Sequence, residues 1–155
     1  MNTSGKDILV VGIGNLLMGD EGVGIHIIRH LEQIPLNDNV EVLDGGTYGL
    51  GLIPFFEGRK KIILIDAIKS DLPAGTIVQV GLEEIELDQG NCFSVHQQGL
   101  QELLLFLRQL KPVPEVVLYG IVARDYKCLS TDLTPEVRAS IPRLVSMLEN
   151  EIGKP

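Results

Sequence analysis

Short runs of valine, isoleucine and leucine recur along this chain, and segments with helical periodicity separate them. Two of the runs, Ile8–Val11 and Ile62–Ile65, are apolar throughout, which is typical of strands covered on both faces, as in parallel sheets. The five strands predicted from these patterns are Ile8–Val11, Val40–Leu43, Ile62–Ile65, Thr76–Val80 and Glu115–Val122. Strands that alternate with helices within one domain predict an α/β fold, with one mostly parallel sheet and helices on both of its faces.

Helices are predicted from apolar spacing and from start signals. A first helix is expected over Gly22–Ile34 with Asp20 as its N-cap, and Gly49–Phe56 is a weaker candidate for a short helix. A leucine-rich helix is expected to follow Ser94, which forms a capping-box pattern with the glutamine three residues later. Thr134 followed by proline and glutamate predicts the start of the last helix.

Composition narrows the class of protein. A chain of 155 residues is the size of one domain, and 13 Lys and Arg against 21 Asp and Glu give a net charge of −8. That sign opposes a nucleic-acid backbone, so no nucleic-acid partner is expected. No apolar run approaches the roughly 20 residues that span a bilayer, and no secretory signal is expected at the N-terminus. Cys92 and Cys128 form no metal-like cluster, which fits two reduced thiols in an intracellular protein.

The loop that follows the first predicted strand is rich in glycine, as in dinucleotide-binding proteins. Gly12 and Gly14 fit the start of the G-x-G-x-x-G fingerprint, but Leu17 stands where its third glycine belongs. The GK[ST] sequence of phosphate-binding loops is also missing. A nucleotide-binding domain therefore remains only an alternative interpretation of this loop.

Four polar residues follow predicted strands or begin predicted helices. Glu21 lies in the first turn of a helix, Asp44 and Asp66 end strands at the carboxyl edge of the sheet, and His96 begins the leucine-rich helix. Each has an ordinary structural explanation as a capping, turn-forming or partly exposed residue. Together, however, Glu21, Asp66 and His96 form a mixed oxygen and nitrogen set that suits nickel, zinc or a similar divalent ion. Three protein ligands would leave coordination positions open for water or substrate.

Other candidates for chemistry are weaker. His26 and His30 are one helical turn apart on a polar face, without the HExxH context of zinc proteases, and are interpreted as solvated histidines. Cys128 has no neighbouring histidine and is interpreted as structural. The chain also lacks a G-x-S-x-G nucleophile motif.

At these residues the sequence resembles the endopeptidases that mature nickel–iron hydrogenases, and the resemblance covers nearly the whole chain. It rests on five segments in the order VVGIGNLLMGDEGVG, VEVLDGGTYG, LIDAI, SVHQQGL and LTPEV. Any one of them would be unspecific, but their combination and spacing are specific. The resemblance implies a cytoplasmic enzyme with a five-stranded twisted sheet flanked by helices. Such an enzyme cuts a C-terminal extension from the hydrogenase large-subunit precursor once nickel has been inserted.

The resemblance also implies roles for individual residues. The metal-contacting residues of the family match Glu21, Asp66 and His96, and its glycine-rich loop near the substrate tail matches Asp44–Thr47. The least matched region, Glu83–Cys92, is expected to help select the partner subunit. Nickel would be contributed by the precursor, although another divalent ion at the same site is an alternative.

The resemblance is compatible with two mechanisms. In the first, nickel in the precursor serves both as a recognition element and as a Lewis acid that polarises the scissile carbonyl or supplies hydroxide. In the second, nickel serves recognition alone, and Asp44 or Asp66 acts as the catalytic general base. The competing class is a non-enzymatic protein, either a metal-dependent adaptor or a nucleotide-binding domain. The protein is expected to be a monomer that pairs transiently with its substrate.

Overall fold

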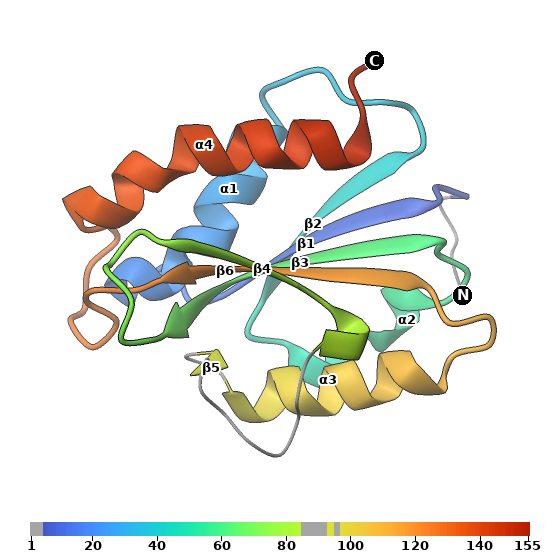
Figure 1. The fold of residues 1–155 in the computed structure, drawn as a ribbon, viewed down its shortest axis with the longest axis horizontal. Coiled ribbons are helices and arrows are strands. Elements are labelled where there is room, and N and C mark those ends of the chain that lie inside the picture. Colours follow the sequence, from blue (N-terminus) through green and yellow to red (C-terminus); the bar gives the residue numbers. More distant parts are fainter. Residues whose placement is uncertain (1–4, 85–92, 95–96) are drawn as a thin grey trace.

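The computed structural model describes residues 5–84, 93–94 and 97–155. Its main sheet has the strand order β2-β1-β3-β6-β4 (Figure 1). The strands on this path are β1 (Ile8–Ile13), β2 (Val40–Gly46), β3 (Lys61–Lys69), β4 (Ile77–Gly81) and β6 (Glu115–Val122). The first three and β6 are parallel, whereas β4 is antiparallel to β6, and the two-residue strand β5 (Phe93–Ser94) pairs with the end of β3. The predicted sheet of five mostly parallel strands is confirmed, with β5 as a short addition.

Helices cover both faces of this sheet, as predicted. They are α1 (Val23–Leu31), α2 (Ile53–Phe56), α3 (Gln97–Gln109) and α4 (Pro135–Ile152), with 3₁₀ turns η1 (Gly19–Gly22), η2 (Gly49–Leu52) and η3 (Leu82–Glu84). Figure 1 shows α1 and α4 on one face and α2 and α3 on the other. Among the described residues, no helix combines the length and the apolar composition needed to cross a membrane.

The core consists of two apolar layers, one on each face of the sheet. Because successive side chains of a strand point to opposite faces, each central strand contributes alternate residues to the two layers. On β3, Ile63, Ile65 and Ala67 pack with α1 and α4, whereas Ile62 and Leu64 pack with α2 and α3. This alternation fixes the face toward which each polar residue at the end of a strand points.

Glycines allow α1 to approach the sheet closely at its carboxyl edge. A Cβ atom on Gly24 would lie 2.6 Å from the backbone oxygens of both Ile13 and Ile65, so no larger residue fits there. Gly12 on β1 faces the backbone of Gly24 in the same way. The start of α1 is therefore pressed against the ends of β1 and β3, next to Asp66.

Three local predictions are wrong. Asp20 is not the N-cap of α1, because that position is Gly22 and Asp20 lies inside η1 with its side chain bonded to a distant loop. Ser94 is not a helix cap, because it pairs with Ile68 in β5 and α3 begins at Gln97. The first helix ends at Leu31 rather than at Ile34. By contrast, Thr134 is the N-cap of α4 as predicted, followed by proline at the first helical position.

Candidate active site

The strand order creates a switch point between β1 and β3. The chain leaves β1 through α1 on one face to reach β2, and it returns through α2 on the other face to reach β3. In open α/β sheets, ligands bind outside the carboxyl ends of the strands at such a point. Glu21 lies in η1, which follows β1, and Asp66 lies on β3, and η1 contacts β3. The structure thus brings the segments of these two carboxylates together.

Glu21 lies on a backbone that is fixed from several directions. Its amide donates to the carbonyl of Met18 and its carbonyl accepts from the amide of Asn15, both at 3.2 Å. A Cβ atom on Gly14 would collide with the same carbonyl of Glu21. The side chain of Glu21 is partly buried. The backbone of the turn that carries the Glu21 carboxylate is therefore tightly constrained.

Asp66 is a fully buried carboxylate in the middle of the sheet. Its relative exposure is 0%, and its position on β3 places it on the same face as Leu64, the face covered by α2 and α3. Burying a carboxylate costs free energy unless other groups stabilise it, so an aspartate here requires a specific environment. This cost makes Asp66 a stronger functional candidate than an exposed turn aspartate.

His96, the third predicted metal-contacting residue, lies outside the described residues. The helix that follows it in the sequence, α3, covers the face of the sheet on which Asp66 lies (Figure 1). Within residues 5–84, 93–94 and 97–155, no group of three histidine, cysteine, aspartate or glutamate side chains is arranged to hold a metal ion. The predicted set of Glu21, Asp66 and His96 thus stays a prediction.

Asp44, the other predicted catalytic residue, lies on β2 and is exposed. Val42 packs with the layer beneath α1 and α4, so Asp44, two residues further, points to that face and away from the face of Asp66. The two strands are separated by β1, which places their backbones about 10 Å apart. Asp44 Oδ1 accepts a 2.9 Å hydrogen bond from the amide of Gly46. The two candidate general bases therefore occupy different environments.

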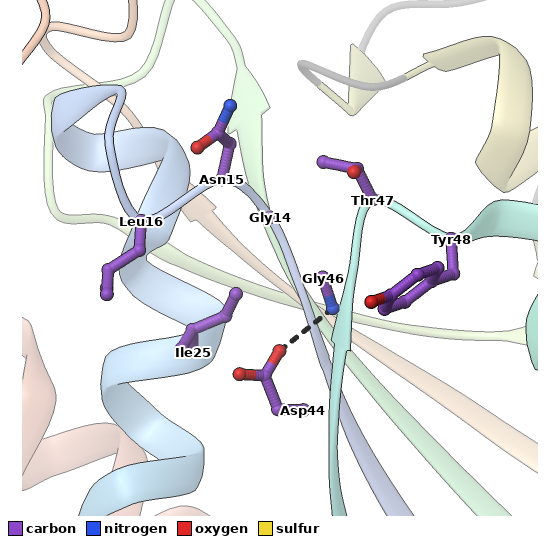
Figure 2. Close-up of a pocket in the computed structure, with 8 residues that line it drawn as sticks. All are labelled: Gly14, Asn15, Leu16, Ile25, Asp44, Gly46, Thr47 and Tyr48. Carbon is purple, nitrogen blue, oxygen red and sulfur yellow. Dashed lines mark hydrogen bonds between the residues drawn. The ribbon is translucent and has the colours of Figure 1, made fainter.

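Asp44 lines an open cleft of about 520 Å³ at the same edge of the sheet. Figure 2 shows its carboxylate between Ile25 of α1 and the turn at Gly46. The lining residues are Gly14, Asn15, Leu16, Ile25, Asp44, Gly46, Thr47 and Tyr48. Backbone, an amide, a hydroxyl and an aromatic ring together suit a peptide segment, whose main chain needs polar partners and whose side chains need apolar contacts.

Several contributors to this edge were missed by the sequence patterns. Asn15, Leu16 and Ile25 line the cleft without forming part of any predicted chemical set. Tyr48, within the VEVLDGGTYG segment, also lines the cleft and is 75% exposed. An aromatic residue directly after a glycine-rich turn is a signal that could have identified it.

The structure also shows the surroundings of the weaker candidates, the histidine pair His26 and His30 and the cysteine Cys128. His26 is half-buried rather than solvated, and burial, followed by the charge of Arg29, lowers the pKa of its imidazole below 6.5. His30 is exposed, as predicted. Cys128 is exposed rather than packed in the core, and a hydrogen bond to Asp125 raises the pKa of its thiol. A raised pKa reduces the thiolate fraction, which argues against Cys128 as a nucleophile.

Comparison with known proteins agrees with this geometry. Residues 25–151 match the family model described as hydrogenase maturation protease. The hydrogenase 2 maturation protease of Escherichia coli strain K12 is 39% identical over 145 residues, which cover 91% of this chain and 88% of that protein. The solved structure of the maturating endopeptidase HybD from Escherichia coli has a TM-score of 0.82 at 35% identity, covering 93% of this chain and 90% of that one.

A second solved structure shows a similar degree of likeness. The [NiFe] hydrogenase maturation protease HybD from Thermococcus kodakarensis has a TM-score of 0.80 at 31% identity, covering 94% of this chain and 99% of that one. The matches to these relatives extend over nearly the full length of this chain and of each relative. The present chain therefore belongs to the hydrogenase maturation protease family and is an endopeptidase.

Proposed function

We propose that this endopeptidase removes the C-terminal extension of a nickel–iron hydrogenase large-subunit precursor, and that it does so after nickel has been inserted. The observation that carries this proposal is the position of the buried Asp66 and of Glu21, on two elements that meet at the switch point of the sheet. A cleft suited to a peptide opens at the same edge. Membership of the family supports the hydrolytic reaction.

Nickel enters this proposal as part of the substrate. Glu21, Asp66 and His96 would contact the metal already held by the precursor, because carboxylates and imidazole are suitable ligands for nickel. A precursor without nickel would lose these contacts and bind less productively. The Asp44–Thr47 turn and Tyr48 would hold the extended tail in the cleft.

The two mechanisms make different demands on Asp44 and Asp66. If nickel polarises the scissile carbonyl, the enzyme needs carboxylates that hold the metal-bearing substrate, and Asp66 fits that role on the α3 face. If a carboxylate activates water without help from the metal, Asp44 is the accessible candidate because it is exposed at the cleft. The hydrogen bond from Gly46 to Asp44 gives this residue a turn-forming role in either case.

The deciding experiment measures intact mass of a cognate precursor before and after addition of the protein. Nickel-loaded and nickel-free precursor are compared side by side, with Asp66→Asn as the inactive control. We expect loss of one discrete C-terminal peptide from the loaded precursor alone. An unchanged mass with verified loaded precursor would contradict the proposal and favour a non-enzymatic adaptor that binds without cutting. Equal cleavage of both precursors would remove the requirement for nickel.

Two further expectations accompany the proposal. We propose that the protein works in the cytoplasm, where a large-subunit precursor would be processed before it is assembled. We also propose a monomer that pairs transiently with the precursor. Sedimentation of the purified protein alone and with precursor tests the second expectation, and a stable dimer of the free protein would contradict it.

A further inference from the structure

The side chain of Asp20, directly before Glu21, is completely buried and binds a loop more than 100 positions away in the sequence. Its Oδ2 accepts hydrogen bonds from the backbone amides of Arg124 at 2.9 Å and Asp125 at 3.0 Å, and from Thr134 Oγ1 at 2.8 Å. Its Oδ1 accepts from the amide of Thr134 at 2.8 Å. The carboxylate therefore joins η1 to both ends of the loop between β6 and α4.

The backbone of the same turn adds to this connection. The amide of Asp20 donates to the carbonyl of Asp125, and the amide of Gly19 donates to the carbonyl of Ser130, both at 2.8 Å. In the opposite direction, the amide of Ser130 donates to the carbonyl of Leu17 at 2.8 Å. The turn that carries Glu21 and the 124–134 loop thus form one hydrogen-bonded unit.

Thr134 shows how specific this arrangement is. It is the N-cap of α4, a position where a threonine hydroxyl usually accepts a hydrogen bond from the start of its own helix. Here the hydroxyl makes no such bond and donates to Asp20 instead. The chain forgoes a local cap and uses the group to complete the set of donors around a buried carboxylate.

We infer that Asp20 is a positioning residue, which together with the 124–134 loop holds Glu21 in the direction required at the active site. This inference rests on the proposed function, because it assigns Asp20 to the alignment of a group that contacts the nickel-bearing precursor. Asp20 itself touches no substrate, since its side chain has no exposed surface. Glu21 is held on its other side by Asn15 and Gly14, so release of Asp20 frees the turn in one direction only.

Asparagine at position 20 would disturb this set without removing the side chain. An amide has one acceptor oxygen, so its NH₂ group would face at least one donor that the carboxylate now binds. Thr134→Val removes one donor, Oγ1, and keeps the backbone amides. Thr134→Ser keeps the hydroxyl and tests rescue. Arg124→Ala is the matched control, because it deletes a side chain in the same loop but leaves the amide that binds Asp20.

The test measures kcat and KM on nickel-loaded precursor, the ratio of affinities for loaded and nickel-free precursor, and the midpoint of thermal unfolding. For Asp20→Asn, we expect kcat/KM to fall about tenfold to a hundredfold, because misplacement of an active-site group by 1 Å can have this effect. The preference for loaded precursor should fall as it does in Glu21→Gln. Thr134→Val should show the same change to a smaller extent, Thr134→Ser should resemble the wild type, and Arg124→Ala should leave cleavage unchanged.

The outcomes separate this inference from the proposed function. If the wild type cleaves loaded precursor and Asp20→Asn and Thr134→Val unfold at lower temperature but keep normal kcat, KM and preference, the role of Asp20 is only structural and the inference is wrong. If Asp20→Asn does not fold, Thr134→Val against Thr134→Ser decides the question. If the wild type cleaves no precursor, the proposed function fails, and the inference fails with it.

Discussion

Two glycine-rich loops follow β1 and β2 at the carboxyl edge of the sheet. They differ in whether distant or neighbouring residues fix their conformation. The loop after β1 is bound by distant parts of the chain: Asp20 is fully buried and Gly19 packs against the backbone of Asp125. The turn after β2 is held mainly by short-range bonds, such as those from Gly46 to Asp44 and from Tyr48 to Gly45. Asp44, near the end of β2, and Thr47 and Tyr48, in the turn, are exposed.

The difference indicates that the two loops have different roles at one site. A loop fixed by many long-range bonds can hold a carboxylate within the narrow geometry that recognition of a metal centre requires. An exposed turn with few long-range bonds can adjust to a peptide main chain.

The largest effects on cleavage are expected from substitution of the carboxylates Glu21 and Asp66. Glu21→Gln and Asp66→Asn should each lower kcat/KM on loaded precursor by roughly a hundredfold or more, because each removes a group expected to contact the reacting centre. His96→Ala should abolish cleavage in both mechanisms. Cleavage assays followed by mass spectrometry provide the measurement. Near-normal activity of Asp66→Asn would overturn the assignment of this residue.

The next prediction compares how much an alanine substitution in each loop lowers the free energy of unfolding. Gly14→Ala should lower the free energy of unfolding by about 3 kcal/mol, because the new Cβ would collide with the carbonyl of Glu21. Gly46→Ala should cost only about 1–2 kcal/mol, the strain of a positive φ angle of 47°, because its nearest neighbour is 3.5 Å away on the flexible ring of Tyr48. Urea unfolding measures both values. Equal losses would show that the two loops are equally constrained.

Substitutions in the exposed turn should change KM for the precursor more than kcat. Tyr48→Ala should raise KM for the precursor by about tenfold with little change in kcat, the loss expected when an aromatic contact in a pocket is removed. Tyr48→Phe is the control, because it keeps the ring. A fall in kcat at unchanged KM would place Tyr48 in the chemical step.

Asp44→Asn tests which mechanism operates in this turn. If metal assistance is sufficient, kcat should remain within about threefold of the wild type, because asparagine can still accept the hydrogen bond from Gly46. If Asp44 is the general base, kcat should fall about a hundredfold or more and its pH profile should change. The pH dependence of kcat for the wild type and the variant distinguishes the two results.

The smallest effect concerns His26, which forms a hydrogen bond to the backbone of Thr131 in the 124–134 loop. Since burial lowers the pKa of this imidazole below 6.5, folding favours its neutral form. Stability from this group is complete above pH 6.5 and is lost as pH falls through the lowered pKa. His26→Asn should therefore show a smaller loss of thermal stability between pH 7.5 and pH 5.5, while His30→Asn, at an exposed position, should match the wild type. Equal losses in all three proteins would contradict the assignment.

The comparison also shows which features local sequence patterns predict correctly and which they do not. The apolar run Ile62–Ile65 correctly predicts a buried strand, although β3 continues through Asp66 to Lys69 instead of ending at the charge, and the strong start signal at Thr134 marks α4 correctly. Asp20 has an equally ordinary local explanation as an N-cap, yet its four hydrogen bonds come from residues 124–134. A local pattern cannot indicate a partner more than 100 residues away.

The sequence by itself determined the order of strands and helices and the edge at which the polar residues gather, because periodicity and strand ends are local properties of the chain. Only the tertiary structure decided that Asp44 and Asp66 point to opposite faces of the sheet. It also decided that Asp20 is buried beneath Glu21 rather than capping a helix. These features depend on strand register and on contacts between distant segments, which form only when the chain packs.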